Sequence, residues 1–247
     1  MYRIASVSVA RRLVLAALLL PLMTQLAIPA PKAQNPGIAP IFSHPHGNSY
    51  PEWAATWWKW ALQTPASVNP ILDRGTCDVG QVGKVWFLGG TFSGAPGATV
   101  RSCTISTGTA LFFPLINNGY FAFLNDPPAQ RTEAFLRAKV SCNDVAITAA
   151  IDGVAVNDPT QYFERSPLFE VQLPQDNVFG LDETVIPQLL LSPSVDSGYY
   201  LFVNPLAPGY HTIHWTAHMT CPDLGNIQQD VTYTVTVVPG GGKHHRP

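Results

Sequence analysis

The stretch VTYTVTVV, from Val231 to Val238, places valine or tyrosine at alternate positions with threonine between them. A period of two is that of a β-strand, whose side chains point in turn to its two faces. One face of this strand would be apolar and the other would carry hydroxyl groups. The stretch therefore predicts a strand in a sheet that has one face buried and one face in water.

Other short segments with strand-like composition lie N-terminal to this stretch, and glycine or polar turn residues bound each of them. Their spacing is typical of an antiparallel all-β unit, and Asp152-Gly153 is a strong hairpin signal. Pro114 cannot donate to a sheet ladder, so its strand should lie at an edge or end there. The predicted strands are Lys84–Leu88, Thr99–Ile105, Leu111–Ile116, Val145–Ile151, Val154–Val156, Leu168–Leu173, Tyr199–Val203 and His211–Thr220.

A tryptophan-rich helix is expected before these strands. Ser49-Tyr50-Pro51-Glu52 fits a capping box, and the helix should then run to about Gln63. Three tryptophans, Trp53, Trp57 and Trp60, share one arc of the helix and are expected to anchor it on a sheet. Trp58 lies on the flank of that arc, where it either packs or stacks on a ligand.

A second helix is expected from Asp126-Pro127 to about Ser141. We interpret the succession of elements as an all-β fold, mainly an antiparallel β-sandwich of the Ig-like or jelly-roll-like kind. One N-terminal Trp-rich helix and one additional covering helix would complete it. The apolar stripe of the second helix would consist of Ala129, Thr132, Leu136 and Val140.

The N-terminus has the layout of an export signal. Arg3, Arg11 and Arg12 precede the apolar run Leu13–Met23, which is too short to span a bilayer. We therefore expect a secreted or periplasmic protein with no transmembrane anchor after cleavage. The expected parts are a signal peptide (1–33, cut after Ala33 or Ala30), an extended leader (34–48), a single β-sandwich domain with helical additions (49–238) and a flexible tail (239–247).

The charge balance excludes some classes of partner. Removing Arg3, Arg11, Arg12 and Lys32 from the 14 basic side chains leaves ten against 16 acidic ones. Nucleic acid is not expected as a partner, because phosphate neutralisation needs a basic face and no such cluster is present. An anionic membrane surface is disfavoured as a partner for the same reason.

The four cysteines are expected to form two disulfides, because an even count in an exported chain favours bridges over a metal site. Of the three possible connectivities we predict Cys77–Cys103 and Cys142–Cys221. The first pair brackets one strand unit, and the second ties a middle segment to a late strand.

Motifs for common catalytic mechanisms, including GxSxG, HExxH and the P-loop, do not occur in the sequence. His214 and His218 would share one face of a strand at about 13 Å from each other, too far apart for one metal ion, and His211 would face the other side. His44 and His46 either grip a metal ion or belong to a flexible leader. We predict no metal and no cofactor.

The polar loop 69–81 leaves two interpretations open. Asp73 and Asp78 either chelate calcium or form ordinary turns held by Cys77. Arg101 either orients a ligand oxygen or carboxylate with two hydrogen bonds, or forms a salt bridge to one of these two aspartates.

Low charge and abundant aromatic residues favour non-catalytic recognition of a carbohydrate or another small envelope ligand, since aromatic faces stack on sugar rings. One alternative is an extracellular hydrolase of glycosides or lactones that uses the carboxylates of Asp73, Asp78 and Glu52, with Asp126 as a further candidate for the catalytic pair. Another is a structural envelope or partner-binding protein with a flat apolar patch. The candidate ligand-binding residues are Trp58, Asn69, Asp73, Gln81, Trp86, Arg101 and Asn117.

Several segments together resemble a family of exported bacterial proteins of unknown function. The most specific are YPEW at 50–53 with Trp57-Trp58, and PLAPGYHTI at 205–213. The resemblance covers most of the chain after the signal and implies a common secreted fold, but it transfers no catalytic residues. The other matching segments are Asn69-Pro70, the loop of Asp73, Cys77 and Gln81, Val85–Leu88, Arg101–Cys103 and Phe112–Asn117.

Overall fold

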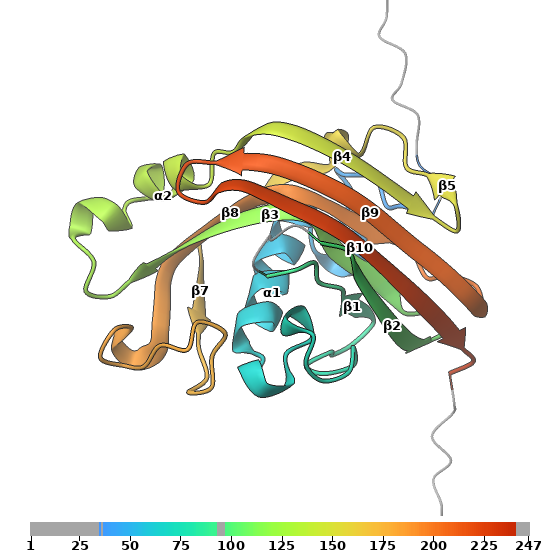
Figure 1. The fold of residues 1–247 in the computed structure, drawn as a ribbon, viewed down its shortest axis with the longest axis horizontal. Coiled ribbons are helices and arrows are strands. Elements are labelled where there is room, and N and C mark those ends of the chain that lie inside the picture. The colour runs from blue at the N-terminus through green and yellow to red at the C-terminus, as the bar shows by residue number, and fades with distance from the viewer. Residues whose placement is uncertain (1–34, 36, 93–96, 241–247) are drawn as a thin grey trace, which may run out of the picture. The chain divides into compact units, whose positions relative to one another are not determined.

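The computed structural model describes residues 35, 37–92 and 97–240. The predicted signal peptide and most of the predicted tail lie outside these residues. The described chain forms two five-stranded sheets, which we call sheet A and sheet B (Figure 1). Sheet A contains β1 (Val85–Phe87), β3 (Ala110–Phe123), β8 (Leu190–Val203) and β6 (Phe163–Arg165) in that order, and β7 (Phe169–Gln172) also pairs with β8. Sheet B contains, in order, β2 (Thr99–Ser106), β10 (Gly225–Val238), β9 (Gly209–Cys221), β4 (Asn143–Ile151) and β5 (Val154–Ala155).

The two sheets pack face to face through aromatic side chains. Phe113 of β3 stacks on Trp215 of β9, with ring centroids 5.0 Å apart, and Trp215 stacks on Tyr233 of β10. Along β10, Val231, Tyr233, Val235 and Val237 are buried, whereas the threonines between them are partly or fully exposed. The alternation in the sequence therefore predicted this strand correctly, and the chain is a β-sandwich. Most strand pairs are antiparallel, but β1 with β3 and β2 with β10 are parallel.

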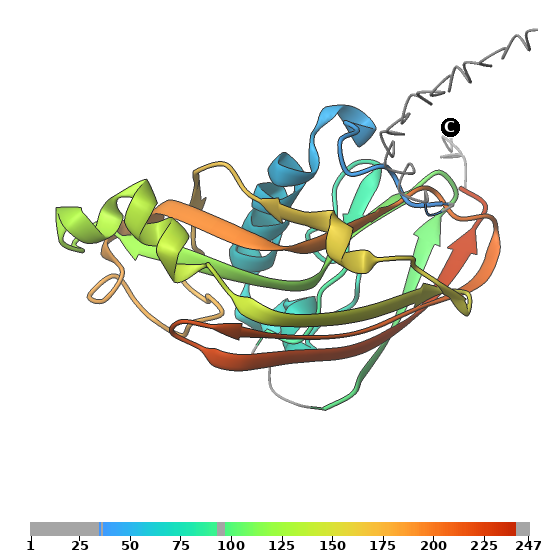
Figure 2. The same ribbon diagram turned by 90° about the horizontal axis from the view of Figure 1, so that it is seen from above.

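Helix α1 (Tyr50–Gln63) covers the other face of sheet A, so that Figure 2 shows it on the side of β8 away from β9 and β10. The predicted capping box is present, since the backbone N–H of Ser49 donates to Glu52 Oε2 at 2.7 Å. The tryptophans on the apolar arc are buried. Trp53 packs against Phe87, Phe112 and Phe202, and Trp60 also packs against Phe87. The helix boundaries and its packing face are confirmed.

The predicted second helix is interrupted at Thr132. A short 3₁₀ helix precedes this residue, Thr132 itself is extended (φ −78°, ψ 145°), and α2 (Glu133–Lys139) follows. The Thr132 hydroxyl accepts a hydrogen bond from the Phe135 N–H at 3.3 Å, so it caps α2 instead of continuing an earlier helix. Leu136 and Val140 are buried as expected, but Ala129 and Thr132 are exposed. The 3₁₀ helices are Pro45–Gly47, Ala66–Val68, Pro70–Leu72, Pro128–Arg131, Pro159–Tyr162 and Pro187–Leu189.

Strand β3 does not end at Pro114, contrary to one of the two expectations for that residue. It continues to Phe123 with a register shift against β8 between Pro114 and Ile116, which accommodates the missing amide proton. Strand β1 pairs with β3 only at Ala110–Phe112. Within the described residues, β3 is therefore an edge strand on that side from Pro114 onward, in agreement with the other expectation.

Both disulfides have the predicted connectivity, Cys77–Cys103 and Cys142–Cys221. The expected leader contributes to the core, because Ile38 bridges Val203 and the Tyr50 hydroxyl donates to Ala39 O at 2.6 Å. The Asp152-Gly153 hairpin forms as predicted, with both residues at positive φ. No helix within the described part of the chain has the length and apolar character needed to cross a membrane.

Candidate functional site

The free edge of β3 borders a cavity of about 680 Å³, which we call the aromatic cleft. Six consecutive β3 residues, Pro114–Gly119, line it together with aromatic rings from α1, from β3 and from two loops. Its polar side chains are mainly amides, and none of the described residues that line it is charged. The rings are Trp57, Trp58, Phe92, Phe121 and Phe179, and the amides are Asn117, Asn118, Asn226 and Gln229.

Gly119 brings the rings of the cleft close to the strand. A Cβ atom at this position would lie 2.9 Å from Trp58 Cζ2 and 2.5 Å from Phe121 Cζ. Without that atom, the ring centroids of Trp58 and Phe121 lie 5.0 Å apart in an edge-to-face contact. Trp58 is only 6% exposed, so it packs in the wall of the cleft and offers a ligand little free ring surface.

A chain of hydrogen bonds leads from the cleft wall into sheet A. Asn117 Nδ2 donates to the Tyr200 hydroxyl at 3.1 Å, and that hydroxyl in turn donates to Asp196 Oδ2. Asp196 and Tyr200 are both fully buried on β8. Burial raises the pKa of Asp196 to about 6, although Tyr200 and Trp58 lower it, and burial followed by the Asp196 charge raises the pKa of Tyr200 well above its ordinary value.

Two buried atoms lie beside these hydrogen bonds and have no hydrogen-bond partner among the described residues. They are Trp58 Nε1 and Asp196 Oδ1. The indole of Trp58 nevertheless lies close enough to Asp196 to lower the pKa of its carboxyl group. Buried polar groups are normally paired, so the polar layer behind the cleft has unused hydrogen-bonding capacity.

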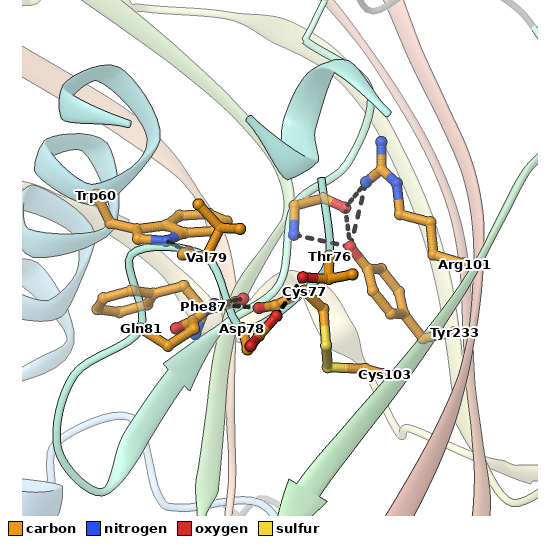
Figure 3. The surroundings of a disulfide bond; sticks show 11 residues. Trp60, Thr76, Cys77, Asp78, Val79, Gln81, Phe87, Arg101, Cys103 and Tyr233 are labelled. Atoms are coloured by element: carbon orange, nitrogen blue, oxygen red, sulfur yellow. Dashed lines mark hydrogen bonds between the residues drawn. A yellow bond between two sulfur atoms is a disulfide. The ribbon is translucent and has the colours of Figure 1, made fainter. Parts of the chain in front are cut away.

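A second cavity, of about 710 Å³, lies beside the Cys77–Cys103 disulfide and is lined by Asp73, Trp86 and Arg101. Arg101 Nε donates to Asp73 Oδ1 at 2.8 Å, and Nη1 lies within hydrogen-bond distance of Gly89 O and the Tyr233 hydroxyl. Figure 3 shows the guanidinium group and the Tyr233 hydroxyl side by side. The structure therefore contains the salt bridge that the sequence left open as an alternative to ligand binding.

Two of the predicted ligand-binding residues hold loops in place instead. Asn69 is fully buried; its Nδ2 donates to the carbonyl groups of Ala61 and Thr64, and its Oδ1 accepts from the Ile71 N–H. Gln81 makes three such bonds to backbone groups of Cys77 and Phe87, as Figure 3 shows. These amides are used within the protein because both loops need partners for backbone groups outside regular structure.

The predicted ligand-binding residues therefore do not form one site. Trp58 and Asn117 line the aromatic cleft, whereas Asp73, Trp86 and Arg101 line the cavity beside the disulfide.

The carboxylates considered for hydrolysis are also divided. Asp73 and Asp78 share the second cavity, where Asp78 accepts a hydrogen bond from the Thr76 hydroxyl. Glu52 caps α1, and Asp126 accepts from the Phe123 N–H at 2.8 Å. The described residues contain no group of three or more His, Cys, Asp or Glu side chains arranged to hold a metal ion.

Two histidines of β9, His211 and His214, each pair with one aspartate. His211 Nδ1 lies 2.7 Å from Asp152 Oδ2, which raises the pKa of His211, and His214 Nε2 lies 3.2 Å from Asp230 Oδ1. His218 is exposed. His211 stands on the same face of β9 as the buried residues, and His214 and His218 stand on the other, as the strand period predicts.

Sequence reasoning missed Asp196 and Tyr200 as members of a site. Asp196 lies in Leu190–Gly198, where serines, proline and glycine obscure the strand pattern. The only signal was an acidic residue four positions before a tyrosine, which is too common to select.

Comparison with known proteins adds little. No family model matches the chain, and no curated protein matches it. Among solved structures, a cysteine protease inhibitor from Entamoeba histolytica is 15% identical with a TM-score of 0.18, and the match covers 58% of this chain and 100% of that one. A likeness of this size carries no argument about fold or function.

Proposed function

We propose that the protein is an exported β-sandwich, Ig-like or jelly-roll-like in kind, that binds a neutral carbohydrate in the aromatic cleft without catalysing a reaction. The observation that carries this proposal is the composition of the cleft wall, whose described residues combine aromatic rings with amides and include no charged side chain. Sugar rings present apolar faces and a rim of hydroxyl groups. Aromatic faces and amides are suited to these two parts of a sugar.

The size of the cleft is compatible with such a ligand. Its volume of about 680 Å³ lies within the range of about 300–1,000 Å³ that is typical of small-molecule sites. Phe179 contributes a ring from the loop between β7 and β8, and this ring makes edge contacts to Phe92. Because Phe179 is partly exposed, its ring can contact a ligand directly.

Export is supported by the two disulfides, which are typical of oxidising compartments. The charged and apolar segments before Ala33 support a signal peptide. Mass spectrometry of the protein secreted by a bacterial host tests this part, and an N-terminus at Gln34 is expected. A chain that keeps residues 1–33 and stays in the cytosol would contradict it.

The binding proposal is tested on an array of neutral glycans, with the affinity for any bound glycan then measured by calorimetry. Phe179→Ala is expected to weaken that affinity about two- to tenfold, because one aromatic contact contributes about 0.5–1.5 kcal/mol. Phe42→Ala is the matched control, since Phe42 is 89% exposed and does not line the cleft. Binding that is absent, restricted to charged glycans, or equally weakened by both substitutions would refute the proposal.

A further inference from the structure

Asn117 joins the cleft to the buried carboxyl group of Asp196. It lines the cleft and is partly exposed, and its Nδ2 is bound to the Tyr200 hydroxyl. Its Oδ1 accepts no hydrogen bond from the described residues, so it is available to a ligand. The side chain is held from behind, because Gly198 leaves room for it: a Cβ at that position would lie 2.4 Å from Asn117 Cβ.

The orientation of the Asn117 amide follows from a single proton. A tyrosine hydroxyl has one hydrogen, and in the structure this hydrogen is donated to Asp196 Oδ2. The oxygen of Tyr200 can then only accept from Asn117, which must present Nδ2 to it and keep Oδ1 for the cleft. An ionised Asp196 therefore gives the cleft a hydrogen-bond acceptor.

Protonation of Asp196 would reverse both hydrogen bonds. Oδ1 has no hydrogen-bond acceptor among the described residues, so a proton taken up from water is stabilised on Oδ2, which then donates to the Tyr200 oxygen. Tyr200 in turn directs its own proton toward Asn117. The amide must rotate by half a turn so that Oδ1 accepts this proton, which leaves Nδ2 for the cleft. No covalent bond changes except the O–H bond formed on Asp196.

We infer that the charge of Asp196 sets, through Tyr200, which end of the Asn117 amide faces the cleft, so that the cleft favours hydrogen-bond donors when Asp196 is ionised and acceptors when it is protonated. The ligand preference rests on the proposed function of the cleft, whereas the rotation of the amide does not. Asn117 is then the residue that determines specificity, and Tyr200 is a positioning residue that acts through it.

Few charged groups act on this carboxyl group. Arg137 of α2 exerts an electrostatic effect that favours the ionised form, and it donates to Asp196 O. From α1 the indole of Trp58 approaches, and the β3 residue opposite Asp196 is Gly119. The charge of Glu164 on β6 raises the pKa of Tyr50 instead. With burial dominating these influences, the carboxyl group changes charge near pH 6.

The rotation is tested without a ligand by NMR. In the wild-type protein, the Nδ2 protons of Asn117 and the carboxyl carbon of Asp196 are expected to shift together between pH 5 and 7.5, with one midpoint near 6. In Tyr200→Phe the Asn117 shift should vanish while the shifts caused by histidines remain. In Asp196→Asn the Asn117 signal should not depend on pH. Asn117 signals that stay fixed in the wild type, or that titrate unchanged in Tyr200→Phe, would overturn the inference.

The preference is tested with indole, which donates a hydrogen bond, and 1-indanone, which only accepts one. Neither changes its charge between pH 5 and 7.5. Raising the pH should strengthen the binding of indole and weaken that of 1-indanone, each about fivefold, as expected for one hydrogen bond. Asn117→Leu should abolish both changes. If the amide rotates but neither probe binds, the coupling of Asp196 to Asn117 is confirmed and the proposed ligand site is refuted. If both probes bind without a pH effect, the predicted change in preference between hydrogen-bond donors and acceptors is refuted.

Discussion

The Asp196 carboxyl group should make the protein less stable as the pH rises from 4 to 7. Burial, partly offset by the hydrogen bond from Tyr200 and by the nearby indole of Trp58, raises the pKa of Asp196 from 3.8 to about 6 in the folded protein. The folded protein therefore holds this proton more tightly than the unfolded chain does. The contribution of Asp196 to stability is then fully present below about pH 4 and is lost as the pH rises through about 6. The difference between these two pKa values corresponds to about 3 kcal/mol.

Urea denaturation of the wild type and of Asp196→Asn at several pH values measures this effect. Other groups act in the opposite direction, since hydrogen bonds from Ser67 lower the pKa of Asp176 and those from Thr184 lower the pKa of Asp182. Both proteins share these groups, so the difference between the two unfolding free energies isolates Asp196. Relative to the variant, the wild type should lose about 2 kcal/mol between pH 4 and 7, because part of the full effect is already lost at pH 4. Parallel pH profiles, or a larger loss in the variant, would refute the reasoning.

Further substitutions test a close contact in the cleft wall, the two disulfides and a helix cap. Gly119→Ala should destabilise the protein by about 1–3 kcal/mol, since its methyl group would overlap two rings, whereas Gly240→Ala, with no atom closer than 3.7 Å, should be neutral in the same thermal melts. A disulfide stabilises a protein by restricting its unfolded chain, and the effect grows with the length of the loop that it closes. Removing Cys142–Cys221, with a sequence separation of 79, should therefore lower the free energy of unfolding by about 4.5 kcal/mol, and removing Cys77–Cys103, with a separation of 26, by about 3.5 kcal/mol. Equal losses in urea denaturation would contradict this dependence on loop length. Thr132→Ala should lower the free energy of unfolding by about 1 kcal/mol, because the Thr132 hydroxyl caps α2. An unchanged midpoint of urea denaturation would show that this hydroxyl does not cap the helix.

The elements that depend on local pattern were predictable from the sequence. The alternation in β10, the capping box at Ser49 and the Asp152-Gly153 turn each act over a few residues, and all three are present. The length of β8 was not predictable, because Leu190–Gly198 is stabilised by neighbours on both sides rather than by its own composition. Residues far apart in sequence supply those neighbours.

The candidate site was predictable only as a set of residue types. Sequence spacing gave no distance between Trp58 and Arg101, and the structure assigns them to different cavities. The register shift near Pro114 placed Asn117 on the side of the sheet that faces α1, next to Tyr200. A one-residue change of register moves a side chain to the opposite face, and no local signal in the sequence fixed that register.

A map of the residues that change on ligand binding tests the site most directly. Amide and side-chain NMR signals would be followed while a neutral glycan identified on the array is added. The largest shifts are expected on Asn117, Gly119 and Phe179, and the signals around Arg101 should not change. Shifts concentrated on the cavity beside the Cys77–Cys103 disulfide, with Asn117 unaffected, would contradict it.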